Sequence, residues 1–148
     1  MLVRQCAGGV VFSGESVFLL QNDKGEWVLP KGAIKNGKIA NEVAITRVRY
    51  EGGVNGQIIS SAGETSYEFF SFSRKRPVCN RINWFVMEAS EPEFSINRME
   101  GFKNGGFFKM DEALSKITYS QDQALVRYAY RKYQEYLEEV DSQRALSS

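Results

Sequence analysis

The fold is decided by two runs of sequence, Trp27-Val28-Leu29-Pro30-Lys31-Gly32 and Tyr50-Glu51-Gly52-Gly53-Val54. The first run leads from a short apolar strand into a proline and a glycine, which end regular strand pairing. Between the two runs, apolar residues recur every three or four positions, at Ile39, Val43, Ala44 and Val48. This spacing predicts a helix over about residues 38–51, which the two glycines then end. We therefore expect a strand, a loop and a helix in that order.

Segments rich in β-branched and aromatic residues on both sides of this unit predict further strands. They lie at residues 4–13, 17–21, 57–62, 65–73, 82–88 and 107–108, with a proline-containing loop at 73–80. A short helix is expected at 110–116. A last helix should begin at Ser120, a good N-cap with Gln123 three residues later, and end near Val140. Strands with one early and one late helix indicate a sheet between helices.

The length of 148 residues fits one compact domain, which we place at residues 1–140, with a frayed tail at 141–148. The chain contains no histidine, which excludes His-based triads, His-ligated zinc and imidazole bases. Cys6 and Cys79 have no metal-site or disulfide spacing and are expected as reduced thiols. No run approaches the ~20 apolar residues of a membrane span, and we expect a cytoplasmic protein.

The two quoted runs resemble the Nudix box, and the order of the other elements is similar to that family along the whole chain. The Pro30-Lys31-Gly32 turn is most similar to the branch that hydrolyses dinucleoside polyphosphates. The resemblance implies an α/β/α sandwich with a mixed β-sheet. It also implies a pyrophosphohydrolase that uses Mg²⁺ or Mn²⁺ to cleave nucleoside diphosphate or polyphosphate derivatives.

The box positions that shape the backbone agree with the family pattern, and most of those that carry the chemistry do not. Agreement is found at Gly32, Val48, Glu51, Gly53 and Val54. Departures from the family's residues are Lys38, Thr46, Arg47 and Tyr50. The family's glutamates hold Mg²⁺ on one helix face, a face that positions 47, 50 and 51 share by their spacing.

Arg47 places a positive charge on that face, where it repels a metal ion and can pair with Glu51 four residues later. Two functions follow. The first is a weakly active hydrolase that relies on Glu51 and Glu100 as catalytic carboxylates, with Gly32 and Glu51 as metal ligands. The second is an inactive module that binds a nucleotide or a phosphorylated metabolite and needs no metal.

Several other side chains are candidate ligand contacts. Lys31 either contacts a phosphate oxygen from the turn or faces solvent, and Tyr67, Phe69 and Trp84 either stack on a nucleobase or pack in the core. The basic cluster at residues 74–76 either contacts a polyphosphate or nucleic acid or keeps a hairpin tip soluble. The expected partner is a small-molecule nucleotide or polyphosphate. The formal net charge of +1 disfavours RNA but leaves a local basic site open, and either a monomer or a homodimer is consistent with the sequence.

Overall fold

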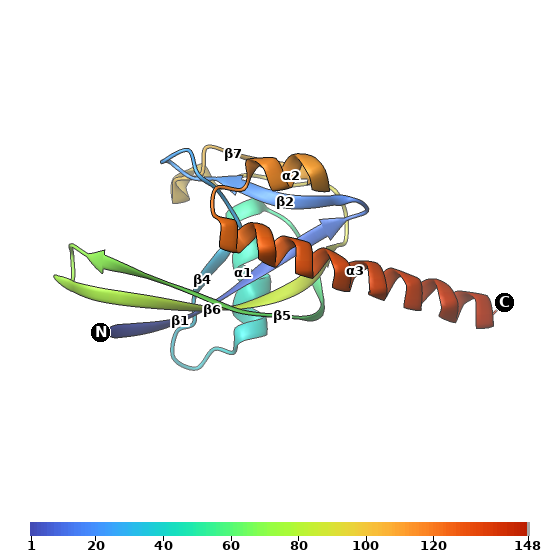
Figure 1. Ribbon diagram of the computed structural model, residues 1–148, viewed down its shortest axis with the longest axis horizontal. Coiled ribbons are helices and arrows are strands. Elements are labelled where there is room, and N and C mark those ends of the chain that lie inside the picture. The colour runs from blue at the N-terminus through green and yellow to red at the C-terminus, as the bar shows by residue number, and fades with distance from the viewer. Residues whose placement is uncertain (148) are drawn as a thin grey trace.

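The structure is a computed structural model that describes residues 1–147, and in it a mixed seven-stranded sheet lies between helices (Figure 1). The strands are β1 (Leu2–Ser13), β2 (Ser16–Gln21), β3 (Trp27–Val28), β4 (Lys31–Ala33), β5 (Gly56–Ser71), β6 (Arg76–Ala89) and β7 (Asn104–Lys109). The helices are α1 (Ala40–Gly52), α2 (Met110–Lys116), α3 (Ser120–Ser147) and the 3-10 turn η1 (Arg98–Glu100).

The sheet has the order β3-β2-β1-β6-β5, with β4 pairing to β1 and β7 to β2. The β1–β6 pair is parallel and every other pair is antiparallel, so the sheet is mixed. Alternate residues of β1 point to opposite faces. Val10 and Phe12 pack with α2 and α3, whereas Ala7 and Val11 pack with α1. The expected α/β/α sandwich is therefore confirmed.

The β5–β6 hairpin is longer and more continuous than the sequence indicated. We expected a break between residues 62 and 65 and a loop at 73–80. Instead, β5 is one strand with register shifts at 58/60 and 61/63, and Gly63 lies in the second shift at φ 92°. A bulge absorbs an extra residue without ending the pairing. Only residues 72–75 form the turn, because Pro77 lies within β6 and pairs with Phe70.

The Pro30-Lys31-Gly32 run continues the sheet, contrary to the expectation that it ends strand pairing. Pro30 accepts a hydrogen bond from the backbone N–H of Gly9 at 3.2 Å. The next residues form β4, in which Gly32 pairs with Ala7 of β1. Proline lacks a donor but keeps its carbonyl, so it can still be held by a neighbouring strand. This pairing fixes Lys31 and Gly32 against the centre of the sheet.

Gly8 makes this close approach possible, and we expect Gly8→Ala to destabilise the protein by about 1–3 kcal/mol, the range for overpacking a core. A Cβ at this position would lie 2.5 Å from the Pro30 carbonyl oxygen and 2.6 Å from the Trp84 ring. Neither a backbone carbonyl nor a buried indole yields easily. Urea unfolding measures the effect, and a free energy of unfolding equal to wild type would contradict this packing.

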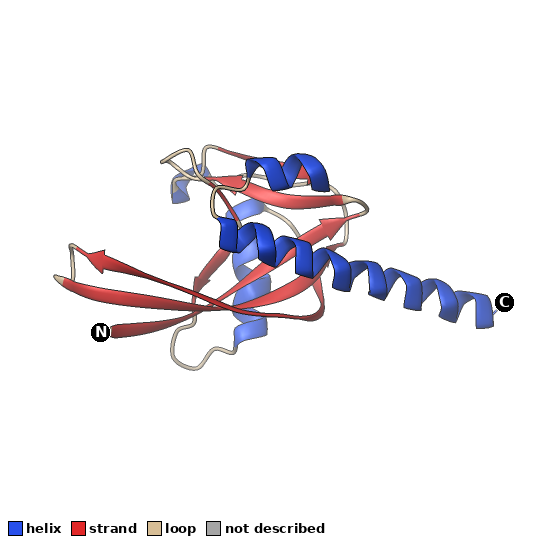
Figure 2. Cartoon of the chain, in the orientation of Figure 1, coloured by secondary structure: helices blue, strands red, loops and turns tan. Residues whose placement is uncertain are grey.

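The last helix extends further than residue 140. In the structure α3 continues to Ser147, and residues 141–147 are exposed. This end projects beyond the sheet (Figures 1 and 2). Ser148, the last residue of the tail that we expected to fray, lies outside the described residues. Within residues 1–147, no helix is both long and apolar enough to cross a bilayer.

Candidate functional site

A cleft of about 750 Å³ opens beside the β3–β4 run. Its walls are formed by the loop after β2, by strands β4, β5 and β6, and by the end of α1. The η1 loop and the start of α3 complete them. Its lining includes Lys31, Glu51, Tyr67, Phe69, Glu100 and Asp122. These residues are far apart in the sequence and meet only in the folded chain.

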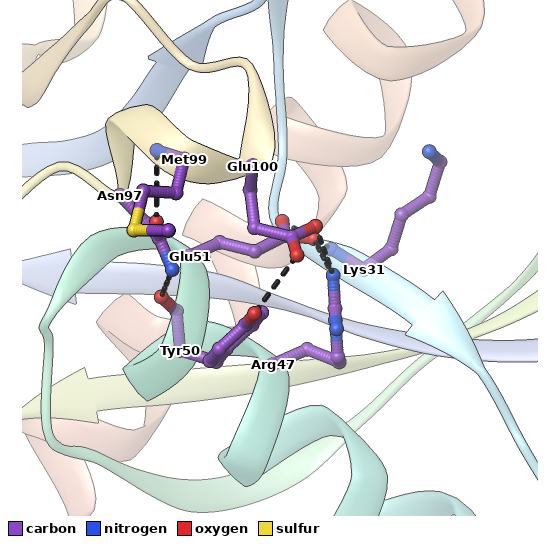
Figure 3. A network of polar contacts seen from close by, with 7 residues as sticks. All are labelled: Lys31, Arg47, Tyr50, Glu51, Asn97, Met99 and Glu100. Carbon is purple, nitrogen blue, oxygen red and sulfur yellow. Dashed lines mark hydrogen bonds and ion pairs between the residues drawn. The ribbon is translucent and has the colours of Figure 1, made fainter.

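The α1 face that points to the cleft carries an ion pair in place of a cluster of acids (Figure 3). Arg47 donates through Nη2 to Glu51 Oε2 at 2.5 Å. The same nitrogen lies 3.6 Å from Glu100 Oε2. Glu51 is only 4% exposed. One guanidinium nitrogen therefore lies between two carboxylates that come from α1 and from η1.

The Arg47 side chain is held by the turn that precedes the helix. A Cβ on Gly32 would lie 2.5 Å from both Arg47 Cδ and Nε, so the arginine occupies the space that glycine leaves free. Its Nε is buried without a hydrogen-bond partner among the described residues. The backbone N–H of Lys31 donates to Glu51 Oε1 at 3.3 Å. The Gly32 position and the Arg47–Glu51 pair thus depend on each other.

Tyr50 connects the end of α1 to η1. Its hydroxyl donates to Glu100 Oε1 at 2.8 Å, and its ring lies 5.0 Å from the Arg47 guanidinium carbon. The Asn97 side chain donates to the Tyr50 carbonyl, and the Asn97 N–H donates to the Glu51 carbonyl. The hydrogen bond to Glu100 raises the pKa of the Tyr50 hydroxyl. These contacts bring Glu100 to Arg47 although it is distant in sequence.

Burial controls the charge of Glu51. It raises the pKa of the carboxyl above its ordinary value, because an apolar surrounding disfavours the charged form. Arg47 and Lys31 oppose this effect and lower the pKa, but burial is the larger cause, and the net shift of the pKa is upward. A buried carboxylate that depends on one arginine for its charge is a poor free ligand.

The residues present do not fit a divalent metal ion. Within residues 1–147, no group of three or more His, Cys, Asp or Glu side chains is arranged to hold one. The two carboxylates that converge, Glu51 and Glu100, already share a cation. Gly32, the other expected ligand, lies against the Arg47 side chain. Lys38 and Thr46, the remaining departures in the box, are both exposed.

Two aromatic side chains of β5 also line the cleft. Tyr67 and Phe69 of β5 are 40% and 38% exposed, and their ring centroids are 5.8 Å apart. Lys31 Nζ lies 5.9 Å from the centre of the Tyr67 ring. Trp84 also borders the cleft but is buried, and its indole N–H donates to Thr65 Oγ1 at 2.7 Å. Trp84 pairs with Gly63, further along the hairpin than the partners of Tyr67 and Phe69.

Glu26, Tyr119 and Asp122 also border the cleft, and no sequence pattern pointed to them. The Tyr119 hydroxyl donates to Glu26, which raises the pKa of Tyr119 to about 12. Burial raises the pKa of Asp122. Only the packing of the start of α3 against the β2–β3 turn brings them together, and no local motif encodes that contact. The residues at 74–76, in contrast, lie at the far hairpin tip and do not line the cleft.

The family model of the NUDIX domain matches residues 3–129. A relative from Mycobacterium tuberculosis (strain CDC 1551 / Oshkosh), described as "Putative mutator protein MutT4", is 27% identical over 103 residues, or 70% of this chain. The match covers only 40% of that relative, so the chain spans less than half of its length.

Two solved structures illustrate the similarity of fold. A C. elegans Ap4A hydrolase in a binary complex superimposes with a TM-score of 0.64 at 16% identity, covering 92% of this chain and 98% of that one. The E. coli dihydroneopterin triphosphate pyrophosphohydrolase gives 0.68 at 15% identity, covering 85% and 95%. At these identities the likeness concerns the fold alone.

Proposed function

The chain belongs to the Nudix family, and from this premise we propose that its cleft binds a nucleoside diphosphate or polyphosphate derivative with weak or absent turnover. One observation carries the second half of the proposal. Arg47 Nη2 lies 2.5 Å from Glu51 and 3.6 Å from Glu100, so an internal cation occupies the point where the carboxylates meet.

Hydrolysis of a phosphoanhydride requires charge on the bridging and leaving oxygens to be neutralised while a water is activated. Glu51 is buried and paired, and Glu100 accepts a hydrogen bond from Tyr50, so neither is a free base for that water. Binding a nucleotide without hydrolysing it requires only contacts to its phosphate and base. Lys31 is placed to meet a phosphate, and Tyr67 and Phe69 offer faces to a nucleobase.

The charge around the cleft limits how tightly a polyphosphate should bind. Four further carboxylates line it, from Asp23, Glu26, Glu68 and Asp122. Like charges disfavour the ligand, and Lys24 and Lys31 offset them only in part. We therefore expect base stacking to supply most of the affinity, which should be modest.

A weakly active hydrolase is the second candidate. It is favoured by the convergence of Glu51 and Glu100 on one point, which would put two carboxylates side by side once Arg47 moved away. The two candidates differ in whether turnover depends on Glu51, and Glu51→Gln tests this directly.

We expect calorimetric titration with a panel of dinucleoside polyphosphates and nucleotide sugars to show saturable binding that survives EDTA. Tyr67→Ala should weaken it about 10-fold, near the lower end of the value of one stacked base. Tyr128→Ala, which removes a ring of similar exposure from α3, is the matched control. Turnover with Mg²⁺ or Mn²⁺ should be slow. Robust turnover that Glu51→Gln abolishes would refute the binding-module function, and a panel without any binder would refute both.

A further inference from the structure

Residues 70–81, at the far end of the β5–β6 hairpin, are basic, and we call them the distal hairpin; the β5 residues that pair with them add one exposed acid, Glu68, which pairs with Cys79. Its cations are Arg74, Lys75, Arg76 and Arg81, and all four are exposed. Within the described part of the chain, the ion pairs found involve Arg47 and none of these four. A chain with a formal net charge of only +1 thus gathers positive charge along the end of this hairpin. The hairpin projects from the rest of the fold (Figure 2).

The same hairpin exposes two phenylalanines beside this charge. Phe70 is 54% exposed and Phe72 is 87% exposed, and their ring centroids are 5.5 Å apart in an edge-to-face arrangement. Phenylalanine is usually buried, and a pair of exposed rings next to cations is more than a soluble tip needs. Phe70 points to the face of β5 opposite to Tyr67 and Phe69, and none of residues 70–81 lines the cleft.

The backbone conformation of the turn does not explain why residue 75 is a lysine. Lys75 has φ 54°, in the left-handed region that glycine and asparagine enter at lower cost than lysine. The Ser71 hydroxyl accepts a hydrogen bond from the N–H of Arg74 and helps to form the turn. A lysine at this strained position is therefore better explained by its side-chain charge than by the turn conformation.

We propose that the distal hairpin binds single-stranded nucleic acid, with Phe70 and Phe72 stacking on bases and the four cations contacting phosphates. Exposed aromatic rings together with a basic surface are the combination that holds single strands without reading sequence. Three of the four cations are arginines, whose planar guanidinium groups form paired hydrogen bonds with phosphate and stack on bases. Unpaired bases expose the faces that such rings need, whereas a duplex hides them.

Fluorescence anisotropy with labelled oligouridine and oligothymidine tests the proposal on the full chain. We expect binding tighter than about 10⁻⁴ M at low salt, the weak end of non-specific affinities. Changing Arg74, Lys75 and Arg76 together to alanine should reduce the dependence of log K on log salt by about 2, since each phosphate contact contributes roughly 0.7 on single strands. The matched control removes three exposed cations elsewhere, at Lys35, Arg127 and Arg131.

Substitutions at Phe72 separate stacking from simple apolar contact, because this side chain is almost fully exposed and its removal leaves the core intact. Phe72→Ala and Phe72→Leu should each weaken binding about 5-fold or more, and Phe72→Trp should restore it. Equal binding by the leucine and tryptophan variants would overturn the proposal. So would retention on vesicles rich in phosphatidylserine without binding to either oligonucleotide, since that result assigns the surface to a membrane. Loss of binding in the control triple variant would overturn it as well.

Discussion

Arg47→Glu combined with Tyr50→Glu is expected to raise the affinity of the protein for Mn²⁺ by at least about 100-fold, because losing even an outer-shell group of a metal site changes affinity by 10–100-fold. The Arg47 side chain reaches the point between Glu51 and Glu100, and Tyr50 already contacts Glu100. Two carboxylates in their place would complete an oxygen-rich cluster of the kind that hard divalent cations require.

The same double variant should be less stable than wild type without metal and regain stability with it. Four neighbouring carboxylates repel one another, and a bound cation at 100 times its dissociation constant contributes about 2.7 kcal/mol. Calorimetry and thermal unfolding with and without Mn²⁺ measure both effects. A control with Lys35→Glu and Gln134→Glu makes the same change in net charge on exposed positions. If Mn²⁺ affinity stays at the wild-type level, the helix face assigned to residues 47, 50 and 51 is wrong.

The box region was predictable because its signals are local. Helical spacing of apolar residues and the glycine pair located α1 to within two residues, with Gly53 in the left-handed conformation at its end. The four-residue separation of Arg47 and Glu51 likewise predicted the ion pair that the structure shows. The Tyr50–Glu100 hydrogen bond was not predictable, since it depends on how the η1 loop folds back onto α1.

Errors in the strands have a common physical cause. Gly63 and Pro77 each suggested an interruption, because glycine and proline usually weaken strands. In the folded chain a bulge accommodates Gly63, and Pro77 pairs with Phe70 of the neighbouring strand. Both β5 and β6 therefore continue through these residues. Whether a strand continues through a glycine or a proline depends on the strand it pairs with, and the local sequence does not reveal that partner. The exposure of Phe70 and Phe72 became evident only once the hairpin was known to extend that far.

The stability of the site should depend strongly on Arg47. We expect Arg47→Met to lower the free energy of unfolding by about 2–3 kcal/mol at neutral pH. A fully buried pair that loses one partner costs roughly 3–5 kcal/mol, and the Arg47 side chain is 27% exposed, which reduces the effect. Arg49→Met, an exposed arginine of the same helix, is the control and should cost far less.

The pH dependence of the stability loss in Arg47→Met should identify Glu51 as its cause. Its pKa is raised in the folded protein, so the folded state binds a proton more readily than the unfolded chain, and stability falls as pH rises through the folded pKa. Without Arg47 the pKa should rise further. The cost of Arg47→Met should therefore be smallest below the ordinary pKa of a glutamate, where protonation removes the unpaired charge, and should grow towards neutral pH.

Adding Glu51→Gln to Arg47→Met should recover most of the lost stability and remove its pH dependence, because no buried charge then remains without a partner. Urea unfolding at several pH values measures the cost of Arg47→Met, its dependence on pH and its recovery by Glu51→Gln. A cost for Arg47→Met below about 0.5 kcal/mol, the value of an exposed helix pair, would mean that water screens Glu51 in solution. In that event the carboxylate is free to act, and the case for a site closed to metal by its own arginine no longer holds.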